Sequence, residues 1–231
     1  MRGPHNIIRL IRTGATLERT GAMNVVLDAF EAPPALRFIA KALGKPFQFL
    51  GYKGDPTMPP ATRALTALGP AYIKFGQILS TRPDVVGNEL AEQLRVLQDK
   101  LPPFPVEIAK AEVQKELGQA TDTIFLEFSE SVAAASIAQV HKAKLAETGE
   151  NVAIKVLRPG IERAFTKDVD AFYLAARIIE IFAPGARRLR PIEVIEHFDG
   201  VVQGELDLRL ESSAAGEVAA NTKDDTGFAL P

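Results

Sequence analysis

The chain has 231 residues, which is long enough for one large domain, or one domain with an extension, and for a sizeable core. Its formal net charge is −2 and 24% of its residues are charged, so bulk electrostatics give no reason to expect a nucleic-acid partner. Cysteine is absent, which excludes disulfides, thiolate metal sites and cysteine nucleophiles and fits a reducing compartment.

Residues 1–60 are predicted to form a helical extension followed by a linker. The first residues lack the long apolar region of a secretory signal, and no run of about 18 apolar residues predicts a transmembrane helix. The extension is mildly basic, with eight Lys/Arg against four Asp/Glu. Gly51 to Pro60 is rich in proline and glycine and is predicted to be the linker.

An amphipathic helix is predicted directly after Pro33-Pro34. Its apolar residues recur with helical spacing and basic residues stand beside them: Leu36, Ile39, Ala40 and Leu43, with Arg37, Lys41 and Lys45. Two interpretations follow. The helix packs on the main domain, which we favour, or it lies at the surface of an anionic membrane.

Residues 61–120 are predicted to be helical and to contain a K-x-G-Q motif. One helix begins at Gly69-Pro70 and ends before Pro83, which places Lys74 and Gln77 on one face. A glycine within a helix costs about 0.5–1 kcal/mol relative to alanine, so Gly76 predicts close approach of another element. An exposed polar face without function would explain Lys74 and Gln77 equally well.

Two further helices are predicted, over Asn88 to Lys100 and Pro105 to Leu117. The first carries Leu90, Leu94 and Leu97 along one side. The second stacks Ala109, Val113 and Leu117 and is closed by Gly118.

A small antiparallel sheet is predicted next, with strands over Ile124 to Phe128, Gln139 to Leu145 and Asn151 to Leu157. The last strand alternates, so that Lys155 faces away from its apolar residues. A lysine in such a strand either extends to water or meets an anion. His141 is expected to pack beside its strand, because the three histidines lack metal-site spacing and no metal site is predicted.

A small-residue loop, Ala133-Ala134-Ala135-Ser136, precedes the second strand. Its backbone N–H groups could approach a ligand almost as closely as those of glycines. The loop and the lysine strand, Val152-Ala153-Ile154-Lys155, together resemble the kinase pattern in which a loop covers the nucleotide phosphates and a V-A-I-K lysine contacts them. Alanines stand where the kinase loop has glycines.

Four motifs occur in order, namely K-x-G-Q, A-A-A-S-I-x-Q-V-H, V-A-I-K and R-P-G-I. Together they resemble the UbiB family of atypical kinase-like proteins, which is associated with ubiquinone (coenzyme Q) biosynthesis. The resemblance runs from about Leu68 to Thr222. It implies an α+β fold that is mostly helical, with a small antiparallel sheet like that of a kinase N-lobe and an added N-terminal helical extension. The chain departs from the family in that we expect its C-lobe to be absent. Residues 121–231 would then be an incomplete kinase-like domain.

The resemblance also implies roles for the matched residues. Lys155 would contact the α- and β-phosphates of ATP or ADP, and the Glu211 carboxylate would hold it. The four residues from Ala133 to Ser136 would form the nucleotide loop. Lys74 and Gln77 would lie on a helix that folds over the site.

An E-x-D element completes the carried-over site, as Glu205 and Asp207. Two acids at i and i+2 point in different directions on a regular helix, so a shared site would need a bend, expected near Gly204. A solvated helix edge would explain Glu205 equally well. Magnesium ligands would belong to the C-lobe, and the chain ends before any catalytic-loop or D-F-G-type aspartate, so we expect a fragment.

The resemblance implies an atypical kinase or ATPase that supports ubiquinone synthesis at the cytoplasmic face of the inner membrane. Its partners would be adenine nucleotide and, beyond it, membrane lipid or intermediates and enzymes of that pathway. Two alternatives remain. One is a flavin-dependent polyprenylphenol hydroxylase, although no G-x-G-x-x-G follows a strand. The other is a non-catalytic helical module that binds lipid or a protein partner.

Overall fold

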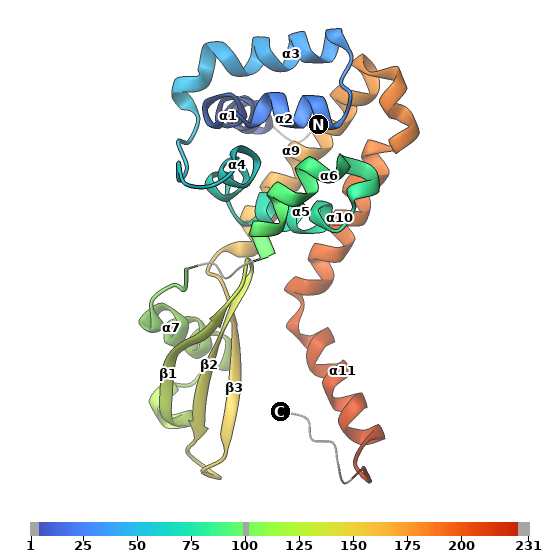
Figure 1. Cartoon of the computed structure of the whole chain (residues 1–231). Helices are drawn as coiled ribbons and strands as arrows, with labels where there is room; N and C mark the ends of the chain where they lie inside the picture. Colours follow the sequence, from blue (N-terminus) through green and yellow to red (C-terminus); the bar gives the residue numbers. More distant parts are fainter. Residues whose placement is uncertain (1–4, 99–101, 226–231) are drawn as a thin grey trace. The chain divides into compact units, whose positions relative to one another are not determined.

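The computed structural model describes residues 5–98 and 102–225. The chain forms two compact units, one made of Met1–Asp99 with Glu162–Asp199, the other of Lys100–Ile161 with Gly200–Pro231. Figure 1 labels their elements, and each unit is described by itself. The sequence predicted three domains, residues 1–60, 61–120 and 121–231, and these boundaries stay a prediction.

In the part that the structure describes, the regular secondary structure of the first unit is all helical. Proline occupies the first turn of many of its helices, where its missing N–H costs no hydrogen bond. Its elements are α1 (His5–Thr20), α2 (Ala22–Ala29), α3 (Pro34–Gly44), η1 (Lys45–Leu50), α4 (Pro60–Leu68), α5 (Pro70–Ser80), α6 (Pro83–Arg95), η2 (Val96–Gln98), α9 (Ile161–Phe182), η3 (Pro184–Leu189) and the start of α10 (Pro191–Leu206).

The K-x-G-Q helix, α5, is confirmed, and so is the close approach that Gly76 predicted. A Cβ built on Gly76 would lie 2.4 Å from Leu97 Cδ1 and 2.6 Å from Leu65 Cδ1. The helix predicted to begin at Asn88 instead begins at Pro83 and is kinked at Gly87, whose φ is 77°. Its predicted end at Lys100 lies outside the described residues.

Helix α3 packs on the extension itself. Leu36 and Ala40 contact the cluster of Met23, Leu27 and Ala32. At its end the backbone meets α1 so closely that a Cβ on Gly44 would lie 2.8 Å from the Gly14 carbonyl oxygen. The contacts of this face are therefore with α1, α2 and Ala32, which follows α2, within the extension, and not with the main domain as predicted. The Leu43 side chain is outside the described set.

The second unit contains a three-stranded antiparallel sheet in the order β1-β2-β3. Its elements are α7 (Val106–Leu117), α8 (Thr121–Ile124), β1 (Phe125–Ala134), β2 (Ala138–Leu145), β3 (Asn151–Leu157), the end of α10 and α11 (Leu208–Asn221). One face of the sheet packs with α7 in a core of Ala109, Val113, Phe125, Ala143 and Val156. The predicted α+β fold with a small antiparallel sheet is confirmed.

Two details of this unit differ from the sequence interpretation. Leu117 is exposed, because α7 ends there and Gly118 turns the chain in a left-handed conformation with φ 69°. Strand β1 continues past Phe128 to Ala134, with register shifts along its pairing with β2. Two of the four predicted loop residues, Ala133 and Ala134, are therefore strand residues.

Within residues 5–98 and 102–225, no helix combines the length and apolar character needed to cross a membrane. The same described residues contain no group of three or more His, Cys, Asp or Glu side chains arranged to hold a metal ion.

Candidate functional site

The lysine of β3 meets the glutamate of α11. Lys155 Nζ lies 2.5 Å from Glu211 Oε2, and both residues belong to the second unit. Val152, Ile154 and Val156 face the core, so strand alternation sends Lys155 to the opposite face of the sheet. The structure therefore brings together the two residues that the family resemblance pairs.

This ion pair contributes little to folding. The Lys155 side chain is 38% exposed and that of Glu211 is 61% exposed. Exposed pairs stabilise proteins by about 0.2–1 kcal/mol, because water screens them and two long side chains lose freedom. The lysine does not need an anion to compensate for burial, as its apolar strand suggested, because it lies on the solvent side.

A row of residues across the sheet connects the lysine with the alanine segment. Lys155 is paired with Val140 on β2, and Val140 is paired with Ala133 on β1. Directly paired residues of antiparallel strands project from the same face. Strands are about 4.8 Å apart, so Ala133 and Lys155 lie about 10 Å apart on the face opposite the α7 core.

The predicted alanine loop is a tight turn. Ala135 N–H donates to the Ala138 carbonyl over 2.8 Å, which closes the turn between β1 and β2. Ser136 and Ile137 are buried, while Ala133 and Ala135 are exposed. Because the side chains of this turn are small, they leave space for a ligand to approach its backbone closely.

Arg158, from the R-P-G-I motif, hydrogen-bonds to the backbone of this turn. Its Nε and Nη2 donate to the Ala135 carbonyl over 3.1 and 3.0 Å, and Nη2 also donates to the Pro102 carbonyl over 2.9 Å. The guanidinium carbon lies 5.7 Å from the Phe104 ring centroid. Partial burial lowers the Arg158 pKa from its ordinary value. The sequence pattern identified Arg158 only as part of the R-P-G-I motif. Its place directly after the lysine strand could have suggested its contact with the alanine turn.

Gln139 and His141 form a buried support under the same hairpin. The Gln139 amide accepts from Phe104 N–H at 2.9 Å and donates to the Phe104 carbonyl at 3.1 Å. It also lies 2.9 Å from His141 Nε2, while His141 Nδ1 lies 2.8 Å from the Ser129 carbonyl oxygen. Both ring nitrogens are thus engaged, and the expectation that His141 packs beside its strand is confirmed.

The E-x-D element lies at a break between two helices. Helix α10 ends at Leu206, and Asp207, with φ −90° and ψ 86°, caps α11. The expected bend therefore occurs at Asp207 and not near Gly204, since the Asp207 carboxylate accepts from the Arg209 backbone N–H at 3.1 Å and stabilises a new helix start. The Arg209 guanidinium also donates to this carboxylate and lowers the Asp207 pKa. Glu205 is half-buried on the last turn of α10.

Lys74 and Gln77 belong to the first unit, whereas Lys155 and Glu211 belong to the second. The Gln77 amide donates to the Leu97 carbonyl over 2.7 Å and so joins α5 to the end of η2. Lys74 is half-buried. These contacts show a structural task for Gln77, and a role for either residue beside the nucleotide stays a prediction.

Helix α5 is anchored by aromatic and polar contacts that sequence reasoning missed. Tyr72 and Phe75 pack on Phe172 of α9, with ring centroids 4.7 and 5.4 Å apart. The Tyr72 hydroxyl lies 2.6 Å from the Thr13 hydroxyl of α1. Beside it, Arg9 of α1 forms an ion pair with the buried Asp168 of α9. The spacing of the aromatic residues is visible in the sequence, but their partners are distant in it.

Asp168 makes the stability of the first unit depend on pH. Burial raises its pKa from 3.8 to about 6, against the opposing effect of Arg9. Between about pH 4 and about pH 6 the folded chain holds a proton that the unfolded chain releases, so stability falls as the pH rises through this window. The loss approaches about 3 kcal/mol, because a tenfold change in proton affinity corresponds to about 1.4 kcal/mol.

We expect Asp168→Asn to flatten this pH dependence, which urea unfolding followed by circular dichroism at several pH values would measure. Glu162→Gln, which removes an exposed acid of the same helix, should keep the slope of the unmodified chain. Equal slopes for Asp168→Asn and the unmodified chain would contradict the assignment.

Arg158→Lys should loosen the alanine turn while keeping the charge, because a lysine cannot reproduce three hydrogen bonds from one planar group. We expect amide exchange in the peptide spanning residues 133–138 to speed up by about tenfold or more, as charge-assisted bonds contribute about 1.5–3 kcal/mol. Arg163→Lys, at an exposed arginine of α9, is the control. Unchanged exchange at the turn would show that Arg158 does not hold it.

Comparison with known proteins bears on the family of this chain. A family model described as the ABC1 atypical kinase-like domain matches residues 96–231. A "Probable protein kinase UbiB" from Marinobacter nauticus is 43% identical over 169 residues, which cover 73% of this chain and 31% of the relative. Another with this name, from Pseudomonas paraeruginosa, is 38% identical over 216 residues, covering 92% of this chain and 40% of the relative.

The chain thus spans between 31% and 40% of the length of these relatives. The matched family model contains the sheet, the alanine turn, the lysine strand and the helices that carry the acids. The resemblance seen in the four sequence motifs is confirmed. The chain belongs to the ABC1, or UbiB-type, family of atypical kinase-like proteins.

Proposed function

We propose that this chain is the nucleotide-binding part of a UbiB-type atypical kinase or ATPase. Adenine nucleotide would bind on the face of the sheet that carries Lys155. The observation that supports this proposal is the contact of Lys155 Nζ with Glu211, at 2.5 Å, on a strand beside a turn of small residues.

The arrangement suits a polyphosphate for electrostatic and steric reasons. An ammonium on a strand, held by one carboxylate, keeps further donor capacity for an anion, as the V-A-I-K lysine of kinases does with the α- and β-phosphates. Ala133, an exposed residue, shares this face of the sheet, and the exposed Ala135 follows it in the turn. In this proposal Arg158 positions the turn and Glu211 positions the lysine, while Lys155 contacts the ligand.

We propose phosphoryl transfer only for a complete protein that has the length of these relatives. In this proposal the magnesium ligands belong to the C-lobe, so we assign no metal contact to the residues described here. The Asp207 carboxylate already accepts hydrogen bonds from the Arg209 guanidinium. We therefore assign nucleotide contact to this chain and derive no transfer step from it. Support of ubiquinone synthesis is the role we propose for the complete protein.

Lys155→Ala should raise the Kd for ATP by about tenfold to about a hundredfold, since one charge-assisted contact contributes about 1.5–3 kcal/mol. Titration calorimetry on the 231-residue chain would measure this. Lys144→Ala is the matched control, because Lys144 lies on the same sheet but is paired with Asn151, at the end far from the alanine turn. Equal ATP affinity of the unmodified chain and Lys155→Ala would overturn the proposal.

A further inference from the structure

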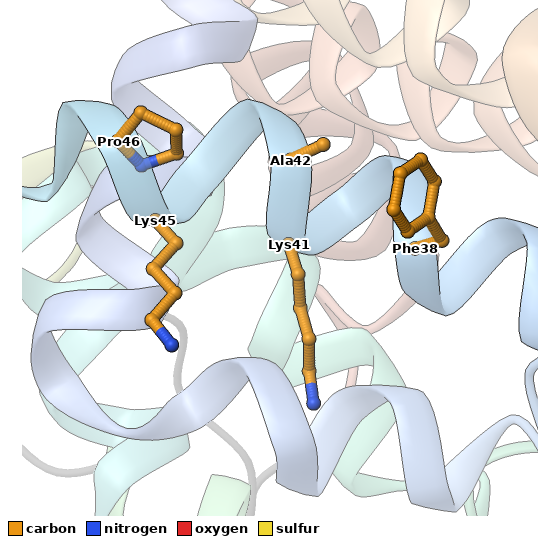
Figure 2. Close-up of a pocket in the computed structure, with 5 residues that line it drawn as sticks. All are labelled: Phe38, Lys41, Ala42, Lys45 and Pro46. Carbon is orange, nitrogen blue, oxygen red and sulfur yellow. The ribbon is translucent and has the colours of Figure 1, made fainter.

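The outer face of α3 carries an exposed basic and aromatic stripe. Phe38, Lys41, Ala42 and Lys45 follow one another at i, i+3, i+4 and i+7, so they lie on one side of the helix. Together with Pro46 they line an open hollow (Figure 2). Figure 2 shows Lys41 and Lys45 extending side by side from the helix, with Phe38 one turn earlier. We call these five residues the α3 stripe.

The α3 stripe is not needed for the core of the extension. The opposite side of α3 already contacts Met23, Leu27 and Ala32 through Leu36 and Ala40. The close contact of Gly44 with Gly14 of α1 fixes the rotation of the helix. The helix is therefore held with the stripe facing outward.

The charge of this segment has one sign. Pro34 to Leu50 contains three basic residues and no acid. Arg37 is engaged by Asp28, whereas Lys41 and Lys45 are exposed and have no ion-pair partner among the described residues. Two lysine ammonium groups one turn apart repel each other slightly, so contact with an external anionic surface would reduce this repulsion.

Large apolar side chains are exposed in the same segment. Phe38 is 74% exposed and Phe49, in η1, is 69% exposed. An exposed ring beside two lysines, followed by further exposed phenylalanines in η1, is typical of elements that lie in a membrane interface.

We propose that the α3 stripe docks on the surface of an anionic lipid bilayer. The Phe38 ring would enter the boundary between headgroups and acyl chains, while Lys41 and Lys45 contact the phosphates. A bilayer fits better than a single phosphate ion because the hollow is lined mostly by apolar groups, while two of its five residues are lysines. This surface is independent of the nucleotide site proposed above, so either proposal stands if the other fails.

The test is co-sedimentation of the 231-residue chain with vesicles of phosphatidylcholine, with and without phosphatidylglycerol. We expect binding to the anionic vesicles, and about thirtyfold or greater loss for Lys41→Glu/Lys45→Glu, since each basic residue near such a surface contributes about a fivefold factor. Phe38→Ser should weaken binding at every lipid composition. Soluble glycerol phosphate should not compete.

Arg163→Glu/Lys167→Glu is the matched control, because it reverses two exposed cations at i and i+4 on α9 and changes the net charge equally. This control should keep most of the binding, and circular dichroism should show unchanged helicity in all variants. Equal vesicle binding by the α3 variant and the unmodified chain would overturn the proposal. So would sedimentation velocity showing that the stripe variants only abolish self-association, which would identify a second copy as the occupant.

Discussion

The candidate site depends on the contact between Lys155 and Glu211, residues 56 positions apart that meet within one unit. The pair is solvent-exposed, so its contribution to folding is small. We propose that its value lies in orientation, because Glu211 holds an ammonium whose residue shares a face of the sheet with Ala133. A stabilising purpose would be served better by a buried apolar contact.

The surroundings of the pair are more rigid than the pair itself. Gln139 and His141 are buried and hydrogen-bonded beneath the hairpin, and Arg158 connects the turn to the segment at Pro102. Helix α11 differs, because none of its described residues is buried and Leu210 is exposed. The sheet thus fixes the lysine, whereas the carboxylate comes from a helix with little packing of its own. This asymmetry makes Glu211 the more adjustable partner.

The sheet and most helices could be predicted because their patterns are local: alternation in β3, proline at helix starts and Gly76 within α5. The pairing of Lys155 with Glu211 came from family resemblance, since no local pattern connects two distant residues. The extension of β1 through Ala134 and the break at Asp207 were missed. Both depend on tertiary pairing and on a cap formed by a side chain, which small-residue composition and helical spacing do not reveal.

The most direct test of the central claim is a double-mutant cycle on ATP affinity with Lys155→Ala and Glu211→Gln. If Glu211 acts by positioning Lys155, Glu211→Gln should weaken ATP binding in the unmodified chain and have no further effect once Lys155 is alanine. Calorimetric Kd values for the four proteins would decide it. Additive losses, or a Glu211→Gln variant that binds ATP as tightly as the unmodified chain, would contradict the positioning role.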